Sequence, residues 1–248
     1  MKIAICIYGH LNDWESKYDD WLNFFNKLRN VNDELSTFDL FVHTWDFNLK
    51  NNKTVQLLTD QSMLNFKNFL SPKIIKVDNQ EKYFSRELEL NSFAKQFAKD
   101  DNVECIAANY ACDLYSIMMS SHLKRTFELE NDIEYDICIA MSTNNTLSGD
   151  HLNLILDTLH IPIDKNIVVA NGVKTFEFPY DKIDYNLYYA NSHTFDVISS
   201  IYNMLPMLNK LQFNPYTDTN FLFGFFLRMF DIKIKRLNIS YKQKQYLI

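Results

Sequence analysis

Residues 3–12 read IAICIYGHLN, an apolar run that stops abruptly at Gly9. The six apolar residues from Ile3 to Tyr8 predict a short buried strand, because strands covered on both faces read as continuous apolar runs. The first strand of an open α/β sheet commonly ends in a loop that faces the ligand crevice. The glycine has two interpretations: it lets the backbone approach a ligand closely, or it relieves a tight turn between strand and helix.

Strand and helix patterns alternate along the rest of the chain. Strand-like runs cover residues 38–45, 72–77, 135–141, 165–171, 185–191 and 232–237, and helical spacing covers residues 13–31, 55–70, 107–130, 192–208 and 216–230. This alternation predicts an α/β fold with a Rossmann-like, mostly parallel central sheet flanked by helices. We expect the helix over 107–130 to be buried against the sheet and the helix at 192 to be capped by Ser192 or Thr194. Residues 78–104 are charged, so we interpret them as a surface insertion in a single domain over residues 1–248.

Composition excludes several classes of partner. The net charge is −6 with a pI near 5.5, and no long basic stretch is present, so nucleic acid is not expected as a partner. No apolar run reaches the ~18 residues that span a bilayer. The four cysteines have no metal-ligand spacing, and two of them, Cys6 and Cys138, lie in apolar strand-like runs, which indicates reduced thiols and a cytoplasmic protein.

Four blocks of the sequence bear on function. They are KIAICIYGHLNDW (2–14), FDLFVHTWDF (38–47), YSIMMSSHLKRTFELENDIEYDICIAM (115–141) and YTDTNFLFGFFLRMFDIKIKRL (216–237). In order and spacing the blocks resemble a family of small glycosyltransferase-like proteins from viruses, phages and bacteria. The resemblance implies a GT-A-like fold that binds a nucleotide-sugar donor and transfers the sugar to a glycan or another hydroxyl acceptor. It also implies a short acidic motif after the central strand that holds Mn²⁺ or Mg²⁺ on the diphosphate.

The chain departs from that family at two places. Where relatives carry an arginine three positions after the glycine, this chain has Asn12, a neutral amide in place of a bidentate cation. Where relatives carry two arginines and an aspartate after the central strand, this chain has a neutral stretch with no carboxylate before Asp150. A neutral oxygen binds a hard cation less well than a carboxylate does, so we predict that nucleotide binding depends only weakly on metal.

The same alignment of blocks supplies the candidate site residues. For donor binding they are Tyr8, Gly9, His10, Asn12, Thr44, Trp45, Asp46, Tyr115, Ser116, Ser142, Asn144 and Asn145. Trp45 has an alternative place in the core, and Asp46 an alternative role as the cap of the next turn. We interpret His43 as structural. Asp218 is the candidate general base for the acceptor hydroxyl, although Thr217 and Asp218 also fit the start of a helix.

Other catalytic signatures are missing from the sequence. It has no GxSxG, Walker or GxGxxG motif, and His151 and His160 do not share a helical face as zinc ligands would. Two hypotheses remain. The chain is either a glycosyltransferase or a catalytically inactive relative that binds a nucleotide, a glycan or a protein.

Overall fold

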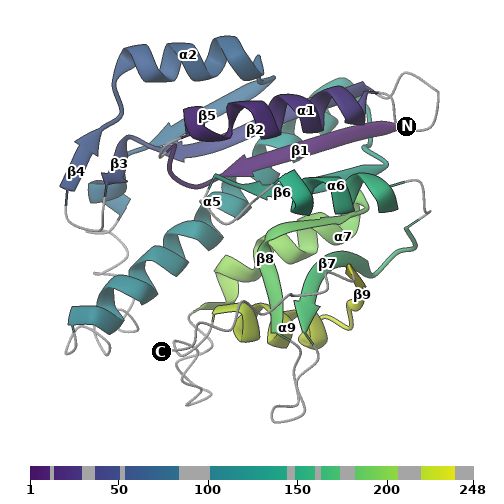
Figure 1. Ribbon diagram of the computed structural model, residues 1–248. Coiled ribbons are helices and arrows are strands. Elements are labelled where there is room, and N and C mark those ends of the chain that lie inside the picture. The colour runs from purple at the N-terminus through teal and green to yellow at the C-terminus, as the bar shows by residue number, and fades with distance from the viewer. Residues whose placement is uncertain are drawn as a thin grey trace, which may run out of the picture.

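The computed structural model describes residues 1–11, 14–29, 37–50, 54–83, 101–143, 149–159, 163–173, 182–205 and 219–237. Figure 1 shows a central twisted sheet with helices on both sides. In chain order the elements are β1 (Lys2–Tyr8), η1 (Trp14–Lys17), α1 (Tyr18–Leu28), β2 (Thr37–Trp45), β3 (Phe47–Lys50), β4 (Thr54–Leu57), α2 (Asp60–Leu70), β5 (Ile74–Asp78), α5 (Asp101–Asn131), β6 (Ile137–Ser142), α6 (Gly149–Thr158), β7 (Ile167–Val173), β8 (Lys182–Ala190), α7 (Ser192–Ser199), η2 (Ser200–Met204), α9 (Thr219–Met229) and β9 (Lys233–Leu237).

Seven strands form the central sheet in the order β5-β2-β1-β6-β8-β7-β9. β1 pairs in parallel with β2 on one side and with β6 on the other, and β2 pairs in parallel with β5. β8 runs antiparallel to both of its neighbours, whereas β9 is parallel to β7. The expected α/β fold with a mostly parallel central sheet is therefore confirmed, with β1 inside the sheet.

Helices cover both faces of this sheet because β1 is apolar on both faces (Figure 1). Ile3, Ile5 and Ile7 point to one face, where they belong to an apolar cluster with side chains of α1, α2 and α6. Ala4 and Cys6 point to the other face and pack in a cluster with α5, α7 and α9. The predicted burial of the long helix against the sheet is confirmed, because α5 lies against β1 and β2.

The predicted helix over residues 55–70 is wrong at its start. Residues Thr54–Leu57 form β4, which pairs antiparallel with β3 in a separate hairpin. The helix begins only at Asp60, because Thr59 has an extended backbone and its side chain accepts a hydrogen bond from the Ser62 N–H at 3.1 Å. The capping residue therefore sets the boundary. Residues 84–100, most of the expected insertion, lie outside the described part of the chain.

The predicted cap of the helix at Ser192 is also wrong. Asn191 is the cap, and its side-chain oxygen accepts from the Thr194 N–H at 2.8 Å. Ser192 already lies in the helix and donates to Glu128, while the Thr194 hydroxyl accepts from the Asn166 N–H at 3.0 Å. Among the described residues, no helix combines the length and the apolar character needed to cross a bilayer.

A buried ion network joins α5 to α7. The Lys124 ammonium donates to a Glu128 oxygen at 3.1 Å and to the Ser192 hydroxyl at 2.6 Å, and it lies 2.8 Å from an Asp196 oxygen. The other Glu128 oxygen accepts from Ser192 at 2.7 Å and from the Tyr135 N–H at 3.0 Å. Every polar group in this network thus has a partner, which is what makes a buried charge tolerable.

Burial opposes the charged forms of Lys124 and Glu128, yet the pKa of Lys124 is raised and the pKa of Glu128 is lowered, so both groups stay charged. Neighbouring acidic groups, Cys138 and Asp196 first among them, raise the pKa of Lys124. Hydrogen bonds from Ser192 and Tyr135, together with Lys124, lower the pKa of Glu128. The network is therefore an ion pair at neutral pH.

Candidate functional site

Four parallel strands, β5, β2, β1 and β6, end at one edge of the sheet. The strand order reverses direction beside β1, because β2 and β5 lie on one side of it and β6 on the other. In open α/β sheets the ligand crevice lies outside the carboxyl ends of the strands at this reversal point. The edge carries Gly9, Trp45, Asp78 and Ser142 and is the candidate functional site.

The loop after β1 is fixed against the end of β6. Gly9 has a φ of 107°, a value that side chains rarely allow, so the turn here needs a glycine. The Thr143 N–H donates to the Tyr8 carbonyl at 2.9 Å, and the Thr143 hydroxyl donates to the His10 carbonyl. The backbone of residues 8–10 is thereby held across the reversal point.

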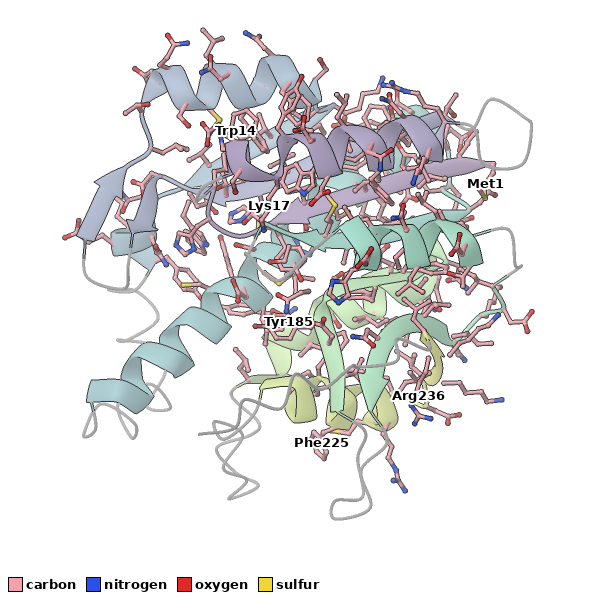
Figure 2. All side chains as sticks on the ribbon, in the orientation of Figure 1. Met1, Trp14, Lys17, Tyr185, Phe225 and Arg236 are labelled. Carbon is pink, nitrogen blue, oxygen red and sulfur yellow. The ribbon has the colours of Figure 1, made fainter. Side chains whose placement is uncertain are left out.

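Tyr8 points away from this loop into the α5 side of the core. Its ring is fully buried, and its hydroxyl donates to the Tyr185 carbonyl at 2.5 Å. The Tyr185 hydroxyl in turn donates to an Asp113 oxygen at 3.2 Å, and Figure 2 shows Tyr185 on β8. Burial raises the pKa of the Tyr8 phenol, so this hydroxyl stays a donor. The contact links β1 to β8 and α5.

His10 is buried and neutral. Burial lowers its pKa, and its Nε2 lies 2.8 Å from the Gln80 side-chain oxygen. Because that oxygen only accepts, Nε2 carries the proton. Gln80 in turn donates to the Cys112 sulfur at 3.2 Å. A chain of contacts therefore runs from the β1 loop to α5.

The end of β2 provides an aromatic group. Trp45 is fully buried and stacks on Tyr115, with ring centroids 5.5 Å apart at 29°, and it also contacts Tyr83 at 5.1 Å. Within the described structure, the Trp45 indole N–H and the Thr44 hydroxyl have no hydrogen-bond partner. The core placement that the sequence left open for Trp45 is thus the one observed.

Asp46 binds the segment that follows β5. One carboxylate oxygen accepts from the Gln80 N–H at 3.2 Å and the other from the Asn79 side chain at 2.5 Å. Asp46 therefore fixes the start of the turn at residue 80, whereas the sequence had offered it as the cap of the turn that follows it in the chain, where β3 begins instead.

His43 lies between a serine and an aspartate. Its Nδ1 accepts from the Ser116 hydroxyl at 2.9 Å, and its Nε2 donates to an Asp78 oxygen at 3.1 Å, which also accepts from Tyr115 at 2.9 Å. The order serine, histidine, aspartate is that of hydrolase triads. However, Ser116 is fully buried, so its hydroxyl does not reach a substrate. The group instead joins β2, β5 and α5.

The pKa values agree with that structural role. Burial lowers the pKa of His43 despite the nearby Asp78 carboxylate, so the imidazole is neutral. The hydrogen bond from His43 is the largest cause that lowers the pKa of Asp78, and Tyr115 and Lys76 add to it. A neutral histidine and an ionised aspartate therefore share one proton at Nε2.

Lys17 was missed by the sequence analysis. It ends η1, is only 7% exposed, and its ammonium donates to the Thr143 carbonyl at 3.2 Å. Figure 2 shows Lys17 beside the carboxyl end of β1. A signal was present in the sequence, because Trp14, Lys17 and Trp21 have the i, i+3, i+7 spacing of one helical face. A lysine at this position in an apolar face indicates a buried ammonium group.

The remaining predicted residues differ in where they lie. Ser142 is fully buried as the last residue of β6. Asn12, Asn144, Asn145 and Asp218 lie outside the described residues. Within the described residues, no group of three or more histidine, cysteine, aspartate or glutamate side chains could hold a metal ion. The structure thus brings together Gly9, His10, Thr44, Trp45, Asp46, Tyr115, Ser116 and Ser142 at one edge of the sheet.

Comparison with known protein families finds no match for this chain, and comparison with curated proteins finds none either. Its function is therefore inferred from the residues and the geometry of this edge.

Proposed function

We propose that the chain is a GT-A-like glycosyltransferase that binds a nucleotide-sugar at the carboxyl edge of β1, β2 and β6. The observation that supports it most directly is the glycine loop after β1, which Thr143 ties to the end of β6 at the reversal point of the sheet. Open α/β sheets bind ligands at that point, and the glycine leaves the backbone free to approach one. The sugar would pass to a glycan or another hydroxyl acceptor.

The described residues at this edge do not fit a divalent metal. Asp46 accepts two hydrogen bonds from the turn after β5, and Asp78 accepts from His43 and Tyr115. Carboxylates bound in this way face protein donors, whereas Mn²⁺ and Mg²⁺ need carboxylate or other oxygen ligands directed at the ion. We therefore propose that donor binding depends only weakly on metal.

A second candidate function is a catalytically inactive protein that binds a nucleotide, a glycan or another protein. The hydrogen bonds of the two carboxylates favour this second candidate, because Asp46 and Asp78 hold the fold together and do not face a ligand. Asp218, proposed as the general base, separates the two candidates. If the chain is an enzyme, Asp218→Asn lowers turnover and leaves donor affinity unchanged.

The test begins with thermal unfolding of the protein in the presence of UDP-, GDP-, CMP- and dTDP-sugars. A ligand at ~100 times its dissociation constant stabilises the folded chain by ~2.7 kcal/mol, which gives a clear shift. The donor that responds is then titrated by calorimetry with Mn²⁺ and with excess EDTA. We expect similar affinities in both conditions, and a loss above ~100-fold on chelation would contradict the weak dependence on metal. Absence of any shift would refute the proposed function, and turnover of a bound donor would decide between enzyme and binding protein.

A further inference from the structure

Lys17 is a cation in an apolar place. It follows Trp14 by three residues and precedes Trp21 by four, and both tryptophans are buried on the face of the sheet that α1 covers. Burying an ammonium group is costly unless hydrogen bonds or charges compensate it. What Lys17 does therefore depends on where its ammonium group lies.

The contact with Thr143 fixes where the ammonium group lies. Thr143 directly follows β6, and the same residue holds the Tyr8 and His10 carbonyls of the glycine loop. The positive charge therefore lies beside the ends of β1 and β6, at the point where an open α/β sheet binds its ligand. Figure 2 places Lys17 at this position, below Trp14.

We propose that Lys17 binds the diphosphate of the donor nucleotide. This inference rests on the proposed function and names the group that would neutralise the ligand. An ammonium group is a point charge with three donors, which suits phosphate oxygens. A diphosphate is anionic, and Lys17 supplies a positive charge at this edge of the sheet.

The competing explanation is that Lys17 has a structural role alone, which includes joining η1 to β6 through the Thr143 carbonyl. The two explanations differ in what the phosphates contribute. If Lys17 contacts the diphosphate, its replacement weakens binding of the nucleoside diphosphate and leaves binding of the nucleoside unchanged. If it is only a structural link, its removal lowers stability and leaves the ratio of the two affinities as it was.

The experiment is calorimetric titration of Lys17→Met, Lys17→Arg and the wild type with a nucleoside diphosphate and its parent nucleoside, in EDTA, using the base found in the donor screen. We expect Lys17→Met to bind the diphosphate 10- to 100-fold more weakly, which corresponds to about 1.4 to 2.7 kcal/mol, and the nucleoside equally well. Lys17→Arg should keep most of the affinity. The matched control is Lys27→Met, because Lys27 is exposed on α1 and donates to Asn153 instead.

The outcomes separate the inference from the proposed function. If Lys17→Met binds the diphosphate within threefold of the wild type, or if the wild type does not prefer the diphosphate to the nucleoside, the inference is wrong and the proposed function stands. If the wild type binds no nucleotide at all, both are wrong. Should Lys17→Met fail to fold, acetylation of the wild type read by mass spectrometry replaces it. The nucleoside diphosphate should then protect Lys17 from acetylation, and the nucleoside should not. Lys27 should be acetylated to the same extent with either ligand. Equal acetylation of Lys17 with both ligands would overturn the inference.

Discussion

Replacing Lys124 by methionine removes the cation from the buried network between α5 and α7. Glu128, with a side chain only 1% exposed, then loses its buried charged partner and keeps the exposed Arg125 at 3.4 Å. Breaking a buried ion pair in this way costs about 3 to 5 kcal/mol, because one charge stays buried without compensation. Glu128 keeps the hydrogen bonds from Ser192 and Tyr135, and Asp196 is partly open to water. We therefore expect a loss near the lower end, about 3 kcal/mol in the free energy of unfolding.

Urea unfolding at pH 7 measures this loss, and the same helix provides a control. Arg125 lies 3.4 Å from the same Glu128 oxygen, but its side chain is 51% exposed. Exposed pairs contribute about 0 to 1 kcal/mol, so Arg125→Met should change the free energy of unfolding by less than 1 kcal/mol. If Lys124→Met costs no more than Arg125→Met, the reasoning from burial is refuted. The difference from wild type should also shrink at acidic pH, because protonation of Glu128 removes the buried charge that Lys124 pairs with.

Two further predictions concern the candidate site. Burial lowers the pKa of His43, so the unfolded chain binds more protons than the folded chain as the pH falls below about 6.5, and stability falls there by up to ~1.4 kcal/mol per pH unit. Urea unfolding at pH 7.5 and 5.5 should show a smaller loss for His43→Gln than for the wild type, and an equal loss in both proteins would contradict this explanation. Gly9→Ala forces a side chain onto a φ of 107°, so it should cost about 1 to 2 kcal/mol of stability and weaken donor binding. Thermal unfolding with and without the donor measures both effects, and an unchanged midpoint would show that the turn does not require glycine.

The sequence predicted those elements whose apolar pattern is set by burial. β1, β2 and β6 were expected within two residues of their observed bounds, because a strand inside a packed core must be apolar at the matching period. The long helix was expected from residue 107, but α5 begins six residues earlier at Asp101, in a stretch assigned to the surface insertion. The start of α2 was misplaced because the apolar residues near Leu57 suit a strand or a helix equally. Only the tertiary pairing of β4 with β3 decides between them.

The candidate site was harder to predict than the fold. Parallel strands end at one edge of a sheet, so the sequence could predict that the ends of β1, β2 and β6 lie close together. Gly9 and Ser142 could therefore be predicted as site residues. Asp78 was not, because its partner His43 is 35 positions away and nothing local marks the contact. The lysine at position 17 escaped notice because a single charged residue in an amphipathic helix usually faces water.

The place of β1 in the middle of the sheet bears on how the chain folds. The Lys2 backbone N–H donates to the Asp136 side chain at 2.7 Å across a separation of 134 positions, and β6 begins directly after Asp136. β1 therefore lacks its β6 neighbour until the segment 134 positions further along the chain has been synthesised. Until then, one long edge of an almost wholly apolar strand stays unpaired, and such edges associate with other chains. Pairing across long separations is also slow. We expect slow refolding, and we expect fragments that end before residue 137 to aggregate.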